Sequence, residues 1–210
     1  MALDLEEQEQ LATLKGWWKD NGTLVLGLIT AVAAGFLAWQ GWLWYQRTQA
    51  LEASTLYESL SKATRAGDAK GVRDAAGALA DNYSRTLYAS MGALASARFH
   101  FDRNDPKTAK AQLQWVIERS KFDDLRDIAR LRLAALLLDE KAYDDALRQL
   151  EAQHGEPFTA QFAALQGDVL AAKAQTAEAK AAYRLALEKS DASNEAFRAG
   201  VQLRLDALGG

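Results

Sequence analysis

The sequence predicts an all-α fold, with a single N-terminal transmembrane helix followed by an α-solenoid of paired helices. Three observations predict it. No charged residue lies between Asp20 and Arg47. The rest of the chain is rich in helix-favouring alanine and leucine, and only Pro106 and Pro157 interrupt it. Small and bulky residues also recur there at a fixed spacing. We therefore divide the chain into residues 1–22, 23–45 and 46–210.

Residues 23–45, TLVLGLITAVAAGFLAWQGWLWY, are predicted to form the transmembrane helix. A helix rises about 1.5 Å per residue, so about twenty apolar residues cross a hydrocarbon core of about 30 Å. Tryptophans gather at both ends of this segment, as in an aromatic belt at the membrane interfaces: Trp17, Trp18, Trp39, Trp42 and Trp44.

Two other interpretations of this segment fit less well. A cleaved signal peptide has a short basic start, whereas the lead-in here is long and acidic. A buried core helix would carry polar residues at helical spacing, and only Thr30 and Gln40 interrupt this segment. A retained anchor is therefore the favoured interpretation.

Gly27, Ala31 and Gly35 fall four residues apart within the anchor and share one helix face. Such a stripe of small residues lets another membrane helix approach closely. Membrane helices are often rich in glycine and alanine without a partner at that face. The stripe is a candidate partner-binding site, and both interpretations stay open.

Charge gives little information on orientation. Lys15 and Lys19 precede the anchor and Arg47 follows it, which only slightly favours a cytoplasmic location for residues 1–22. The net charge of −3 lies in this N-terminal tail, and the remainder of the chain is balanced. A nucleic-acid-binding protein needs a basic face, so we expect no nucleic-acid partner.

After the anchor, the apolar residues adopt helical spacing. A first helix is expected to end at Ala66-Gly67-Asp68, and a second to cover residues 69–83. Three later segments each show a small residue, an alanine twelve residues on, and a bulky residue four further: Ala97, Ala109 and Leu113; Ala134, Ala146 and Leu150; Gly167, Ala179 and Tyr183. This is the tetratricopeptide pattern, with a period of about 34 residues.

The spacing has a physical reason. We expect the small residue to face the alanine of the partner helix, while the bulky residue fills the groove beside them. Gly167 supports this interpretation over an ordinary alanine-rich bundle, because a mid-helix glycine costs about 1 kcal/mol relative to alanine. A final amphipathic helix over residues 195–208 is predicted to close the solenoid.

No active site is expected. Cysteine is absent, which excludes thiol chemistry, and the two histidines, His100 and His154, are expected to lie on the surface. The acidic pairs at residues 123–124 and 144–145 are assigned to helix starts. We predict no enzyme activity, no cofactor and no metal site. Candidate partner-binding residues on the concave face lie beside the packing positions: His100, Arg103, Arg130 and Gln166.

The chain resembles the YfgM family, the ancillary subunits of the bacterial Sec translocon. The residues that carry this resemblance run through most of the sequence: the acidic Glu6-Glu7-Gln8-Glu9-Gln10, Lys15, Trp17-Trp18, Asn21-Gly22, Gly41-Trp42, Trp44, Ala53-Ser54, Tyr57, Leu131-Arg132-Leu133-Ala134, Gly167-Asp168 and Gln202-Leu203-Arg204-Leu205. Leu43 departs from the family, which often has a basic residue after Gly41-Trp42.

The resemblance implies a single-pass protein of the bacterial inner membrane, with a cytoplasmic N-terminus and a periplasmic repeat domain. It also implies three partners: the SecYEG translocon, a PpiD-type membrane chaperone and unfolded secretory proteins. The expected function is a non-enzymatic adaptor that links emerging secreted proteins to periplasmic chaperones. The alternative is a membrane-anchored scaffold for assembly or signalling that faces the cytoplasm.

Overall fold

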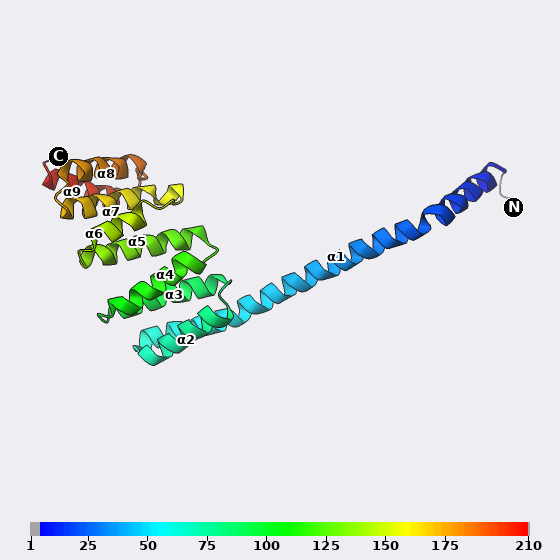
Figure 1. Ribbon diagram of the computed structural model, residues 1–210, viewed down its shortest axis with the longest axis horizontal. Coiled ribbons are helices and arrows are strands. Elements are labelled where there is room, and N and C mark those ends of the chain that lie inside the picture. Colours follow the sequence, from blue (N-terminus) through cyan, green and yellow to red (C-terminus); the bar gives the residue numbers. More distant parts are fainter. Residues whose placement is uncertain (1–4, 210) are drawn as a thin grey trace. The chain divides into compact units, whose positions relative to one another are not determined.

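The computed structural model describes residues 5–209, so the first part of the acidic tail, including Asp4, lies outside the described residues (Figure 1). These residues form α-helices and one short 3-10 helix, and none of them lies in a β-strand. The chain divides into two compact units, one ending at Gln49 and the other beginning at Ala50.

Helix α1 (Leu5–Ala66) has 62 residues and contains the apolar segment. Among the described residues, it is the one helix long and apolar enough to cross a membrane. Its large apolar side chains point outward, with Leu24 75% exposed and Trp44 70% exposed. Within this segment, the Thr30 hydroxyl donates to the Leu26 carbonyl at 2.8 Å, so the helix itself satisfies this polar group. These features fit a single-pass anchor.

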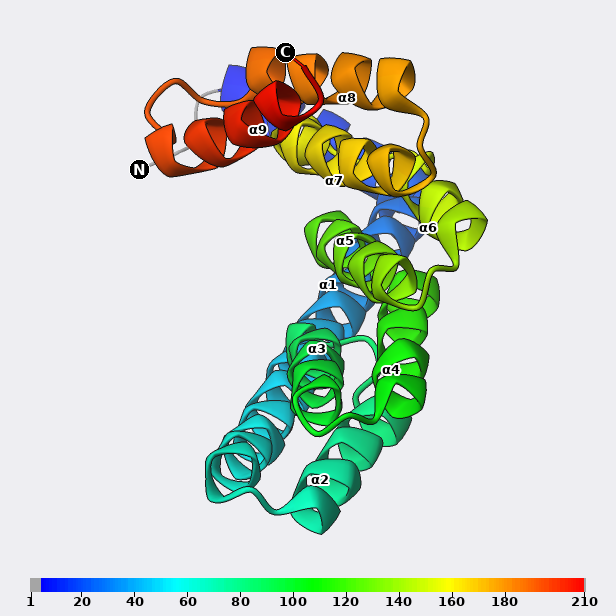
Figure 2. The same cartoon turned by 90° about the vertical axis from the view of Figure 1, so that its left-hand side faces the viewer.

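The second unit consists of helix pairs. Its elements after α1 are α2 (Ala69–Asn82), α3 (Leu87–Phe101), α4 (Pro106–Arg119), α5 (Asp123–Asp139), α6 (Tyr143–Leu150), η1 (Glu156–Phe158), α7 (Thr159–Ala172), α8 (Thr176–Lys189) and α9 (Glu195–Ala207). Figure 2 shows α3 and α5 on one side of the stack and α4 and α6 on the other. The predicted all-α fold, an apolar N-terminal helix followed by a tetratricopeptide-like solenoid, is confirmed.

The turns inside the pairs repeat one backbone conformation. A residue with positive φ separates the two helices four times: Gly67 (74°), Asn104 (60°), Lys141 (62°) and Ala174 (60°). The left-handed conformation ends a helix and reverses the chain, and it favours glycine. The predicted helix stop at Gly67 is therefore confirmed, and the recurrence at the other three turns supports the repeat register.

Gly167 of α7 lies in a tight contact, as its mid-helix position predicted. A Cβ atom at this residue would lie 2.5 Å from Cε1 of Tyr183 on α8. The three nearest atoms all belong to the ring of Tyr183, which lies over the glycine. The absence of a side chain at Gly167 makes room for this ring, and the Tyr183 hydroxyl then donates to Asp168 at 2.8 Å.

The N-terminus of α4 is capped by Asp105. Its Oδ1 accepts from the Thr108 backbone N–H at 3.1 Å, and its Oδ2 lies 3.0 Å from Nδ1 of His100. Hydrogen bonds from the Thr108 side chain and backbone, and then from His100, hold the pKa of Asp105 below its ordinary value of 3.8. A carboxylate at a helix N-terminus is also favoured by the helix dipole.

Substituting Gly167→Leu should lower the free energy of unfolding by about 1–3 kcal/mol, because the added side chain overlaps the Tyr183 ring. Thermal unfolding of the full chain measures this. Gly77→Ala is the matched control, since a Cβ there meets no atom within 4 Å and alanine is about 1 kcal/mol better than glycine in a helix. An unchanged melting temperature for Gly167→Leu would contradict the contact.

Stability should fall in acid partly through Asp105. Because its folded pKa is lowered, its contribution is present above the ordinary value of 3.8 and is lost as the pH falls through the folded pKa. In Asp105→Asn the cap acceptor remains but this titration is gone, so the melting temperature should depend less steeply on pH below about pH 5.

Melting curves across this pH range provide the measurement. The control is Asp124→Asn, because Asp124 is exposed and makes no hydrogen bond with the described residues. Parallel pH profiles for the wild type and Asp105→Asn would disprove the assignment.

Candidate binding surface

Two of the predicted partner-binding residues, His100 and Arg103, make contacts at the first two loops between paired helices. His100 is only 6% exposed, so the expectation of a surface histidine is wrong at this position. Its Nε2 is buried without a hydrogen-bond partner among the described residues. The Arg103 guanidinium lies 3.7 Å from the centroid of the Phe99 ring and donates to the Gly67 carbonyl at 3.2 Å. Both side chains therefore support the packing of neighbouring turns.

The third candidate, Arg130, holds the connection between α6 and α7. Its Nη1 donates to Asp127 at 3.0 Å and to the Gln153 carbonyl at 3.3 Å. Asp127, 2% exposed, also accepts from the Gly155 N–H at 2.8 Å. This buried carboxylate is therefore matched by an arginine and a backbone donor, as a buried charge requires.

The fourth candidate, Gln166, is half-buried on α7 and makes no hydrogen bond with the described residues. The structure thus leaves Gln166 free and commits the other three side chains to internal contacts. Their role in binding a partner stays a prediction.

A groove is lined by α3, α4 and α5, of which α3 and α5 are the first helices of two successive pairs. Its volume is about 280 Å³. We call it the arginine groove and define it by Arg98, Phe101, Arg132, Ala135, Leu136 and Asp139. None of the four candidate residues on the concave face lines this groove. The available signal was position, since Arg98 and Phe101 lie one and four residues after the packing residue Ala97.

The two arginines of the groove differ in their partners. The Arg98 Nε donates to Asp102 on the same helix at 2.8 Å. Arg132 makes no hydrogen bond or ion pair with the described residues. The pKa of Arg132 is lowered, first by burial and then by the charge of Arg98, because both disfavour the charged form of its guanidinium group.

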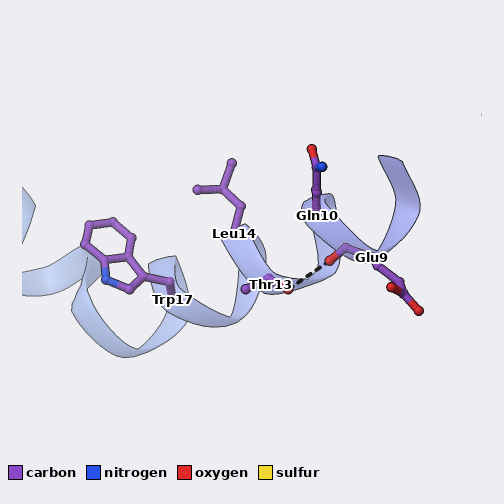
Figure 3. A pocket seen from close by; sticks show the side chains of 5 residues that line it. All are labelled: Glu9, Gln10, Thr13, Leu14 and Trp17. Carbon is purple, nitrogen blue, oxygen red and sulfur yellow. Dashed lines mark hydrogen bonds between the residues drawn. The ribbon is translucent and has the colours of Figure 1, made fainter. Parts of the chain in front are cut away.

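A larger hollow of about 620 Å³ lies along α1, beside Glu9, Gln10, Thr13, Leu14 and Trp17 (Figure 3). All five residues come from neighbouring turns of one helix. The Thr13 hydroxyl donates to the Glu9 carbonyl at 2.9 Å. Among the described residues of the first unit, no second element lines this hollow.

The anchor stripe is exposed on α1. A Cβ atom at Gly27 or Gly35 would meet no atom within 4 Å, and Ala31 is also exposed. No described residue of the first unit fills the space beside Gly27 or Gly35. Across the part of the chain that the structure describes, no group of three histidine or acidic residues could hold a metal ion.

Comparison with known proteins gives a consistent result. Residues 15–210 match the tetratricopeptide repeat-like domain family. The chain is 32% identical to an ancillary SecYEG translocon subunit of Neisseria gonorrhoeae, over 99% of this chain and 100% of that protein. A protein of the same name from Haemophilus influenzae is 31% identical, over 89% of this chain and 91% of that protein. The one from Escherichia coli K12 is 29% identical, over 96% of this chain and 96% of that protein.

The apolar helix, the repeat unit and these full-length similarities agree with one another. The chain belongs to the YfgM family, whose members are named ancillary SecYEG translocon subunits.

Proposed function

We propose that this protein is a non-enzymatic adaptor of the Sec translocon, which links emerging secreted proteins to the periplasmic chaperone network. The observation that carries the proposal is the similarity to ancillary SecYEG translocon subunits, which extends over both the apolar helix and the repeats. A stack of helix pairs offers extended surfaces for other proteins. This architecture suits an adaptor.

Each part of the chain has a place in this function. Residues 1–22 lie in the cytoplasm, residues 23–45 cross the inner membrane, and residues 46–210 lie in the periplasm. Secreted chains emerge on the periplasmic side, so a repeat domain placed there meets them as they leave the channel. A chain without cysteine is compatible with that oxidising compartment.

Three partners follow from this placement: the SecYEG channel, a PpiD-type membrane chaperone and unfolded secretory proteins. The stripe of Gly27, Ala31 and Gly35 is the proposed contact with a membrane helix of the channel or the chaperone, because small residues permit close packing in lipid. In the repeat unit, Arg103 is exposed and Gln166 is half-buried, so these two candidates are the more accessible to a soluble partner.

The non-enzymatic assignment is supported by the residues available. The His100–Asp105 pair resembles part of a proton relay, but the free nitrogen of His100 is buried. A substrate cannot reach it there, and catalysis needs a group within hydrogen-bond reach of the reacting atom.

A second candidate function is a scaffold that faces the cytoplasm. The near-equal numbers of lysines and arginines on the two sides of the anchor motivate it, because they discriminate only weakly between the two orientations. Orientation separates the two candidates, because only one of them places the repeats outside the cytoplasm.

Protease added to intact spheroplasts should digest residues 46–210 and leave the N-terminal tail protected. Immunoblotting with tags at either end measures this. A cytoplasmic protein serves as the control for intact membranes. A repeat domain that stays protected until the cells are lysed would establish the cytoplasm-facing scaffold instead.

A photo-crosslinking residue at Ala31 should capture a subunit of the channel or the membrane-anchored chaperone in living cells, because it lies in the small-residue stripe. Ala33 is the matched control, since two residues along a helix point to nearly opposite sides. Mass spectrometry of the adducts identifies the partner. Equal capture from both positions, or capture of neither protein, would argue against this interface.

A further inference from the structure

The arginine groove contains one exposed arginine, Arg132, that has no direct ion pair with the described residues. Arg98 is paired with Asp102, whereas Arg132 has no ion pair with the described residues. An anion that enters the groove would relieve the repulsion between the two guanidinium groups and accept their hydrogen bonds. Guanidinium groups match the planar geometry of a carboxylate especially well.

The same groove offers apolar surface. Phe101 is 44% exposed, although Phe99, two residues earlier on α3, is 3% exposed. Beside the arginines, the wall contributed by α5 contains Ala135 and the buried Leu136. An occupant therefore gains from placing an apolar side chain next to its carboxylate.

Size and charge limit what can occupy this place. The groove volume of about 280 Å³ lies just below the range of small-molecule pockets, which begins at about 300 Å³. The groove can therefore hold a few side chains but not a whole helix. Asp139 lies two helical turns after Arg132 on α5 and disfavours a second negative charge at that end. A short extended segment with one acidic side chain fits these limits.

We infer that the arginine groove binds an extended segment of an unfolded protein in which an acidic side chain lies next to an apolar one. This inference rests on the proposed function, since it specifies the clients of an adaptor. Chains that are still leaving the channel present internal segments before their C-termini. An acidic side chain, not a C-terminal carboxylate, is therefore the anion available.

Fluorescence anisotropy with the full-length protein in detergent micelles tests the inference. The probe is a short labelled peptide with blocked ends, rich in glycine and serine, that contains Leu-Glu pairs. A matched peptide carries Leu-Gln pairs. The Leu-Glu peptide should bind about tenfold more tightly, and added salt should reduce this difference.

Variants of the protein locate the effect. Arg132→Gln should remove the preference for glutamate without lowering the melting temperature, because Arg132 makes no bond that folding needs. Asp139→Asn should tighten binding of the Leu-Glu peptide, since it removes a like charge. Arg184→Gln is the control, because Arg184 is exposed on α8 and makes no ion pair with the described residues; it should keep the preference.

Several results would overturn the inference. These are equal affinities for the two peptides, no binding of either, an unchanged preference in Arg132→Gln, or binding only of a Leu-Gln peptide with a free C-terminal carboxylate. None of them affects crosslinking from Ala31, which tests the proposed function separately. Failure of that crosslinking with an intact peptide preference would contradict the proposed membrane interface alone.

Discussion

The close approach of the two helices in a pair is the constraint on which the repeat unit depends. At Gly167 the backbone of α7 lies against the ring of Tyr183, and a single Cβ atom would fill that space. Ala97 and Ala134 are buried at the equivalent positions. Tyr183 then reaches Asp168, which also accepts from Arg204 of the closing helix α9. Burial raises the pKa of Asp168, because its two donors offset only part of the cost of placing a carboxylate there.

Polar side chains hold the ends of the helix pairs. The Ser90 hydroxyl of α3 donates to Ser120, which caps α4, at 3.0 Å in the interior, and Asp127 of α5 accepts from the backbone of Gly155, which follows α6. Such groups satisfy backbone atoms that the turns leave unpaired. Polar residues beside the packing positions, such as Arg130, thus make contacts inside the stack. Their role in binding a partner stays a prediction.

The two units use apolar residues in opposite ways. The repeat unit buries them between helices, whereas α1 exposes Leu24 and Trp44 along its outer surface. In water this exposure would be unfavourable, but in lipid it is required, because a spanning helix satisfies its own backbone and presents apolar side chains outward. A membrane-anchored repeat protein needs both arrangements.

The sequence by itself determined the helical class, the apolar anchor segment, the helix stop at Gly67 and the tight contact at Gly167, because these depend on composition, periodicity and single-residue conformational preferences. Only the tertiary structure decided that Tyr183 covers Gly167, that His100 is buried, and that Arg98 and Arg132 share a groove. These facts depend on which side chains of separate helices meet. Spacing along one helix specifies a face, but the neighbour of that face is set by packing between helices far apart in the sequence.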